Sequence, residues 1–362
     1  MVEKSDNPYR HLPAKAFWRT GVAEAGLFGL SQLWSSAWTL PADAQFVTFG
    51  SCFAQHISRA LISRKMNWLN AEPAPGRTPP ELAQKYNYGV FSARTGNIYT
   101  AAQLLIWARL ASGAAGADSV EYWTDGAGLV HDMLRPKIEP QGFVSRKEAE
   151  ASVASTARAF ARCITEADVL VFTLGLTEGW INTATGQSYS ICPGTGVGTF
   201  EEGVHAFHNY TYPEILRDLE AALQIMWQMN PDLHVLLTVS PVPLVATASG
   251  DHVLVATQYS KSVLRAVAGD MANSHAQVDY FPSYEIIAAP SSRGTFFEPN
   301  MRAIAHDGVD LVMRHFFAGL DLSAPARRAG TGGDAGRAAV EAQMQAEELV
   351  CEEMLLETFN ER

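Results

Sequence analysis

The sequence predicts an α/β protein with three layers, in which a mainly parallel β-sheet lies between two layers of helices. Apolar segments of strand length alternate with amphipathic segments of helix length along most of the chain. Two strand segments, 168–175 and 233–241, are apolar nearly throughout, as expected for strands that are covered on both faces. Strands that alternate with helices of this length favour crossover connections, and therefore a parallel sheet.

The elements follow one another in a regular order. We expect strands at residues 45–50, 168–175, 233–241 and, followed by a loop, within 278–287. We expect helices at residues 51–65, 99–110, 146–167, 212–231, 260–275 and 308–320. The first of these helices carries apolar residues at helical spacing, namely Phe53, Ile57, Ala60 and Leu61. Asp125-Gly126 predicts the turn of a β-hairpin within 121–134.

The chain divides into four parts by composition. Residues 1–45 are rich in aromatic residues and predict a segment that wraps the body, packing it with Phe17, Trp18, Trp34 and Trp38. Residues 46–322 hold the α/β domain. A Gly- and Ala-rich stretch at 323–336 predicts a flexible linker. Residues 337–362 predict an acidic amphipathic helix that serves homo-oligomer formation or partner docking.

Composition argues against several classes of protein. The 362 residues carry a net charge of −11 without any basic cluster, which disfavours binding to nucleic acid or to an anionic membrane surface. No apolar run of about 18 residues predicts membrane insertion, and the N-terminus lacks a secretory signal, so we expect a cytoplasmic protein. The 4 cysteines are scattered, so neither a metal site nor a disulfide framework is predicted. No cofactor is expected.

Ser51 is the first candidate for chemistry. It follows Gly50, where a predicted strand passes directly into a helix, and serine is a common helix N-cap. The same position also suits a nucleophile. A serine at this turn projects its hydroxyl at the carboxyl edge of the sheet, where the free N–H groups and dipole of the helix stabilise an oxyanion. The sequence leaves both interpretations open.

Several motifs resemble one known family. The stretch GSCFAQHI at 50–57 resembles the signature of the GSCFA domain family, which is placed in the SGNH, or GDSL-like, hydrolase superfamily. Further blocks resemble that family in the same order, and they are YNYGVFSARTG at 86–96, FTLGLTEGW at 172–180, LTVSPV at 237–242, YSKSVLRA at 259–266 and YFPSYEI at 280–286. The resemblance covers most of residues 46–317 and implies the flavodoxin-like SGNH fold.

The resemblance also implies a site. In SGNH enzymes the serine of the first block attacks an ester carbonyl, and its own N–H helps to bind the oxyanion. Carried onto this chain, Ser51 is the nucleophile and Gly89 a second oxyanion donor. The place of the family's oxyanion asparagine falls near Thr177, with Glu178 beside it, and a threonine hydroxyl donates one hydrogen bond.

The general base is where this chain departs from the pattern. A gapless match of 296–317 to the family's last block, anchored on Phe296, Phe297 and Met301, places Asn300 at its aspartate and Ala303 at its histidine. Alanine cannot accept a proton. Two histidines are candidates for a relocated base, His306 and His208, the latter with Asn209 beside it. His252 is a weaker candidate. His56 is expected to be structural. Cys52 is a weaker alternative nucleophile.

Two functions therefore stay open at this point. One is a serine-dependent hydrolase or O-acyltransferase that acts on a small polar or carbohydrate acyl ester, and the sequence leans towards such an enzyme. The alternative is a catalytically inactive SGNH-fold protein that binds a glycan or metabolite. The alanine at 303 and the threonine at 177 motivate this alternative.

Overall fold

The computed structural model describes residues 7–323, 356–357 and 359–360. Nearly all of the predicted linker (323–336) and C-terminal helix (337–362) lie outside the described residues. Within the described part, no helix is both long enough and apolar enough to cross a membrane.

The order of elements confirms the predicted alternation. The helices are α1 (Gly26–Gly29), α2 (Ala54–Ser63), α3 (Pro80–Lys85), α4 (Ala101–Ser112), α5 (Arg146–Glu166), α6 (Tyr212–Met229), α7 (Val253–Ser274), α8 (Ser283–Ala288) and α9 (His306–Gly319). The strands are β1 (Thr39–Leu40), β2 (Phe46–Gly50), β3 (Tyr122–Thr124), β4 (Val130–Asp132), β5 (Val169–Leu174), β6 (Glu178–Asn182), β7 (Ser188–Tyr189), β8 (His205–Asn209), β9 (His234–Val239), β10 (Val278–Phe281) and β11 (Asp321–Leu322).

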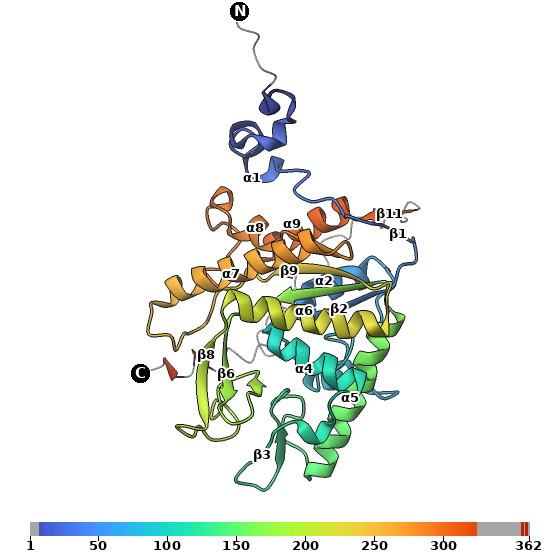
Figure 1. Ribbon diagram of the computed structural model, residues 1–362, viewed down its shortest axis with the longest axis vertical. Coiled ribbons are helices and arrows are strands. Elements are labelled where there is room, and N and C mark those ends of the chain that lie inside the picture. The colour runs from blue at the N-terminus through green and yellow to red at the C-terminus, as the bar shows by residue number, and fades with distance from the viewer. Residues whose placement is uncertain (1–6, 324–355, 358, 361–362) are drawn as a thin grey trace, which may run out of the picture.

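The central sheet is parallel, as predicted. Its strands lie in the order β10-β9-β5-β2, and every neighbouring pair is parallel. Figure 1 shows helices on both sides of this sheet. All four strands therefore end at the same edge, which brings together the residues that follow β2, β5 and β9. In the described part of the chain the fold is the predicted three-layer α/β arrangement.

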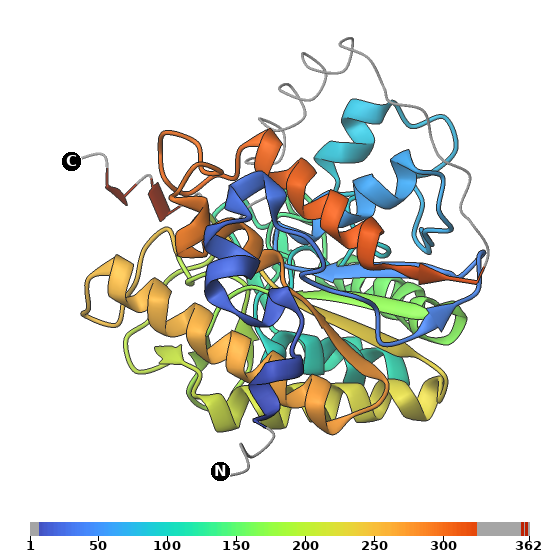
Figure 2. The same cartoon turned by 90° about the horizontal axis from the view of Figure 1, so that it is seen from above.

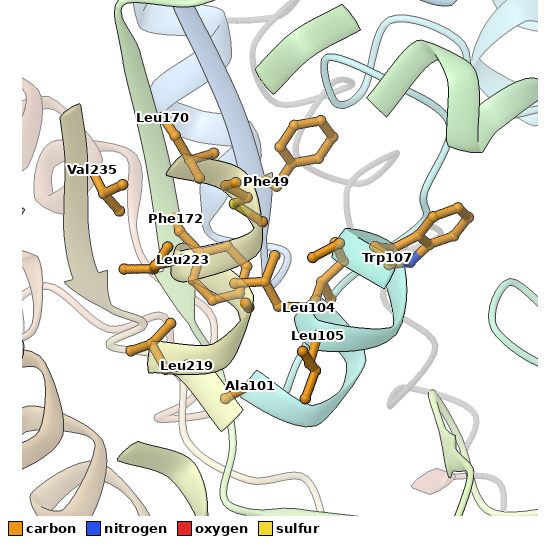
Figure 3. Packing of buried hydrophobic residues seen from close by; sticks show 14 of the residues in the cluster. Phe49, Ala101, Leu104, Leu105, Trp107, Leu170, Phe172, Leu219, Leu223 and Val235 are labelled. Atoms are coloured by element: carbon orange, nitrogen blue, oxygen red, sulfur yellow. The ribbon is translucent and has the colours of Figure 1, made fainter. Parts of the chain in front are cut away.

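One face of the sheet packs against α4, α5, α6 and α7. Phe49, Leu170, Phe172 and Val235 point from the strands into this layer and are almost completely buried. Figure 3 shows Phe49 and Phe172 facing the side chains of α4 and α6, with Trp107 at the outer end of the cluster. Alternate residues of the same strands point the other way, as the pleat of a strand requires.

The opposite face packs against α2, α8 and α9. Phe46, Val171 and Leu236 project into this layer, where they meet side chains such as Ile57 of α2 and Phe316 of α9. Apolar residues on both faces of a strand explain why the strand segments of the sequence are continuously apolar.

A small antiparallel sheet lies between β5 and α6, and the sequence analysis missed it. Its strands are in the order β7-β6-β8. Glu178 pairs with Asn209 and Trp180 with Phe207 across β6 and β8. The strands are short and are separated by glycine-containing loops, so no hydrophobic periodicity marks them.

The N-terminal segment corrects one prediction. Trp34 packs against Phe281 and Phe316, and its indole Nε1–H donates to Asp279 at 3.1 Å, so this part does pack on the body. Trp18 is 66% exposed, and Phe17 is exposed as well. Figures 1 and 2 show the first helical turns lying above the layer of α8 and α9 instead of around the body. The predicted packing of Phe17 and Trp18 was wrong because aromatic content alone does not show which rings find a core.

The ends of β2 and β5 approach closely at Gly50. The φ angle of Gly50 is +129°, a conformation that favours glycine. A Cβ at this position would lie 2.6 Å from the backbone nitrogen of Thr173, which is paired with Gly50 across the two strands. Two independent constraints, the backbone angle and the space, therefore require glycine here.

Gly50→Ala should lower the free energy of unfolding by about 3 kcal/mol, because it adds both backbone strain and a clash with a strand. Urea denaturation measures the change. Gly128→Ala is the matched control, since φ is +82° there and nothing lies within 4 Å of the added Cβ. The control should cost only about 1 kcal/mol. Equal losses in the two variants would show that the contact with Thr173 does not constrain the fold.

Candidate functional site

The Ser51 hydroxyl lies in the turn that joins β2 to α2. The helix begins at Ala54, three residues later than predicted, and its N-cap position, Phe53, makes no side-chain capping bond. Ser51 is 2% exposed, and its Oγ has no hydrogen-bond partner among the described residues. The interpretation of Ser51 as a helix N-cap is therefore wrong. A buried hydroxyl without a partner calls for a functional or structural explanation.

The backbone around Ser51 corrects one implied role. The N–H of Ser51 donates to the carbonyl of Thr173 at 3.0 Å, so it already has a partner and does not point freely at a substrate. The hydroxyls of Thr173 and Thr177 are also buried without a partner among the described residues. Three buried hydroxyls therefore have no partner among the described residues. They belong to Ser51, to Thr173 within β5, and to Thr177 shortly after β5.

Gly175 lets the end of β5 lie directly against the serine. A Cβ on Gly175 would come within 3.0 Å of the Ser51 Cβ and within 3.2 Å of the Tyr99 ring. Both the N–H of Gly175 and that of Leu176 donate to the carbonyl of Tyr99, at 3.1 and 3.0 Å. Ser51, Gly175 and Tyr99 therefore form one closely packed group at the carboxyl edge of the sheet.

Two neighbouring residues of α7 hold this turn in place, and the sequence analysis did not assign them to the site. Lys261 is 1% exposed, and its Nζ donates to the carbonyl of Gly175 at 2.7 Å. The Oγ of Ser260 accepts a hydrogen bond from the N–H of Thr177 at 3.0 Å. The available signal was the block YSKSVLRA at 259–266, which places Lys261 and Ser260 among the motifs that resemble the family. A fully buried lysine is rare without a specific partner.

The structure separates Gly89 from Ser51. Gly89 is exposed, has a φ of +72°, and its nearest neighbour is the side chain of Asn70. The part of this block that reaches the serine turn lies further on, where the N–H of Ile98 donates to the carbonyl of Gly50 at 2.8 Å. The described contacts therefore do not support Gly89 as an oxyanion donor.

The candidate histidines make contacts elsewhere. His208 lies 3.1 Å from Glu214, and the ring of Tyr210 packs against it. His306 is the first residue of α9, is 43% exposed, and lies 3.4 Å from Asp310. His252 accepts a hydrogen bond from the N–H of Leu254 at the start of α7. The Ser51 hydroxyl has no hydrogen-bond partner among the described residues, so none of these three rings bonds to the predicted nucleophile in this structure.

His56 lies in α2, on the side of α9. Burial lowers its pKa to about 3, and the charges of Arg59 and His306 lower the pKa in the same direction. Burial also lowers the pKa of Arg59, to about 10. His56 is therefore neutral at pH 7, and its structural role stays a prediction.

The remaining predicted residues occupy different places. The carboxylate of Glu178 is mostly buried and accepts a hydrogen bond from the Thr247 hydroxyl at 2.7 Å. Asn209 pairs with Glu178 across β6 and β8, and its Oδ1 is buried without a partner among the described residues. Asn300 is exposed, and its Oδ1 accepts from the N–H groups of Arg302 and Ala303, both at 2.9 Å. Asn300 thus shapes its own loop.

A cavity of about 470 Å³ lies beside this group. Tyr99 and Leu176, which contact or neighbour Gly175, line it, and so do Glu178 and Trp180 of β6. The cavity lies between the small antiparallel sheet and the loop after β9, and Ser51 itself is not among its lining residues. Among the described residues, no group of three or more His, Cys, Asp or Glu side chains is placed to hold a metal ion.

Together these features define an α/β protein in which the buried hydroxyls of Ser51, Thr173 and Thr177 lie at the carboxyl edge of a parallel sheet, beside a pocket that is partly open to solvent. Residues 45–316 match the model of the GSCFA family, and the chain belongs to this family. The matched range includes all the blocks, from 50–57 to 280–286, that resemble the family. Searches of the curated proteins and of the solved structures found no match.

Ser51→Ala should change the free energy of unfolding by less than about 0.5 kcal/mol, because the hydroxyl makes no hydrogen bond that the mutation removes. Ser145→Ala is the control, since the Ser145 hydroxyl does cap α5 by accepting from the N–H of Glu148. The control should cost about 1 kcal/mol. Urea denaturation measures both changes. A loss of about 1 kcal/mol in Ser51→Ala would show that Ser51 does cap the helix.

The neutral His56 predicts a pH dependence of stability. Between pH 6.5 and about 3 the unfolded chain binds a proton at His56 and the folded chain does not, so stability falls as the pH falls. The slope should reach at most about 1.4 kcal/mol per pH unit. His56→Gln should flatten the pH dependence between pH 7.5 and 5, measured by urea denaturation at both values. The exposed His252, changed to Gln, is the control; a wild-type slope in His56→Gln would contradict the prediction.

Proposed function

We propose that this chain is a serine-dependent acyl hydrolase or acyltransferase in which Ser51 is the nucleophile. The observation that carries the proposal is the buried hydroxyl of Ser51, which neither caps α2 nor bonds to another described residue. Glycines at 50 and 175 bring the strand ends against it at a cost in conformational freedom. If Ser51 served only stability, its buried hydroxyl would be expected to make a hydrogen bond. The resemblance to SGNH hydrolases supports the same assignment.

The reaction would proceed in two balanced steps. The Ser51 oxygen forms a bond to the acyl carbon, the bond from that carbon to the ester oxygen breaks, and the serine proton ends on the leaving alcohol. Water or a second alcohol then takes the acyl group, and its proton returns to Ser51. Thr177 is suited to donate to the oxyanion, because its hydroxyl is buried without a partner among the described residues.

Two findings set conditions on this proposal. The Ser51 oxygen has almost no solvent-accessible surface, so side chains that cover it must move before a substrate reaches it. The described contacts of His208 and His306 are with Glu214 and Asp310 and not with Ser51, so neither contact supports these imidazoles as the proton acceptor. Hydrolysis by the usual serine–histidine route is therefore disfavoured.

A second candidate function is the binding of a small molecule without catalysis. The observation that favours it is the cavity of about 470 Å³, whose lining includes neither Ser51 nor a histidine among the described residues. The alanine at position 303, where the family's ending carries histidine, points the same way.

A fluorophosphonate probe distinguishes the two functions. The wild-type protein should be labelled on Ser51 and should hydrolyse p-nitrophenyl acetate. Ser51→Ala should lose both, with a fall in turnover of about a hundredfold or more. Ser240→Ala is the control, because this buried serine follows β9 and should keep both activities. A wild-type protein that is folded but neither labelled nor active would support binding instead.

The histidine variants test the conclusion about the base. His208→Gln and His306→Gln should each keep the rate of labelling within about threefold of the wild type, because neither ring is placed to activate Ser51. The rate is measured by intact-protein mass spectrometry. A loss of about a hundredfold in either variant would identify that histidine as the base, and would mean that the site rearranges before reaction.

A further inference from the structure

We propose that the cavity beside Ser51 binds a bulky, uncharged, apolar acyl group, so that the preferred substrates are esters of medium-chain or aromatic acids. This inference rests on the proposed function and names its substrate class. The cavity and the serine lie on either side of the same residues. A Cβ on Gly175 would meet both Ser51 and the Tyr99 ring, and Tyr99 and Leu176, the residue after Gly175, line the cavity. An acyl group whose carbonyl carbon reaches Ser51 would therefore extend past Tyr99 into this space.

The lining of the cavity is mainly aromatic and aliphatic. Trp180 meets Phe200 and Phe207 edge to face, with ring centroids 5.5 and 5.8 Å apart. Leu176 and Leu244 complete the apolar wall. Interlocked rings hold their positions and offer an apolar surface at a low cost in side-chain entropy. An acetyl group would leave most of about 470 Å³ unfilled, whereas this volume lies in the range of cavities that bind whole metabolites.

The charge of the lining excludes an anionic acyl group. Glu178 is the one carboxylate among the described lining residues, and these include no lysine, arginine or histidine. Burial raises the pKa of the Cys192 thiol, which keeps this side chain neutral. A phosphate or a second carboxylate on the acyl group would meet no cationic partner in the cavity and would be repelled by Glu178.

The chain itself places apolar side chains on this cavity. Leu356 and Phe359, close to the C-terminus, are both among its lining residues. Phe359 stays 57% exposed, so it contacts the cavity without filling it. The contact shows that the surface accepts apolar groups, and that a longer acyl chain would meet these two side chains.

A comparison of chain lengths tests the inference. The ratio kcat/KM for p-nitrophenyl octanoate should exceed that for p-nitrophenyl acetate by about tenfold or more, since apolar burial favours the longer chain. Ala246→Trp places a ring in the cavity from an exposed lining position. It should lower the octanoate value about tenfold and leave the acetate value within about threefold. Ala184→Trp is the control, in an exposed turn after β6 that does not line the cavity, and should change neither value.

Binding is measured separately so that the two proposals fail differently. Ser51→Ala cannot react and should bind the neutral amide N-methyloctanamide, but not N-methylacetamide, in isothermal titration calorimetry. Adding Ala246→Trp should abolish this binding. If Ala246→Trp does not fold, Ala248→Trp replaces it, because Ala248 is also exposed and lines the cavity.

Each outcome has one meaning. Binding of the octanamide without turnover of any ester would refute the proposed enzyme and leave the apolar site standing. Turnover that favours acetate and is insensitive to Ala246→Trp would refute the acyl-group inference while the enzyme stands. No binding of the octanamide to Ser51→Ala would also refute the inference.

Discussion

The site depends on how closely the end of β2 approaches the end of β5. Gly50 and Gly175 are the two positions at which any side chain would push these strand ends apart. Because both lack a Cβ, the Ser51 turn can hydrogen-bond to Thr173 through its N–H while its hydroxyl lies against the residues that follow β5. The position of the serine therefore follows from backbone packing and not from side-chain hydrogen bonds.

Around this approach the fold adds a second support from α7. Lys261 and Ser260 each bond to the backbone of the segment 175–177, one to a carbonyl and one to an N–H. The hydrogen bond from the buried Lys261 side chain to the Gly175 carbonyl stabilises one loop conformation over others, because breaking it would cost a buried polar group one of its bonds. Hydrogen bonds thus connect the ends of β2 and β5, the serine turn and α7.

The sequence predicted the layers well because burial on both faces of a strand leaves a continuous apolar run, which is easy to recognise. It also located α5 closely, since Ser145 and the turn after Glu166 mark both of its ends. The small antiparallel sheet escaped notice because its strands are short and lie between glycine-containing loops.

The contacts of the candidate site residues were predicted less well than the layers, since these contacts depend on the paths of loops. Gly89 has the right place in the motif, yet the loop carries it away to Asn70, and Ile98 meets Gly50 instead. Ser51 has the sequence of a cap, but the helix starts three residues later. His306 pairs with Asp310 at the i, i+4 spacing of α9, whereas His208 pairs with Glu214 six residues on, which no spacing rule shows. Lys261 was overlooked because a lysine on a helix usually reaches solvent.

The segment with β6, β7 and β8, inserted between β5 and α6, forms a wall of the cavity, whereas the rest of the domain forms the main core. Trp180, Phe200 and Phe207 belong to this insertion, whereas the parallel sheet and its helices form the main core without those three rings. Loops that extend from a stable body tolerate substitution more easily than the body does. Substitutions within the insertion can consequently reshape the wall of the cavity while the parallel sheet and the serine turn stay unchanged.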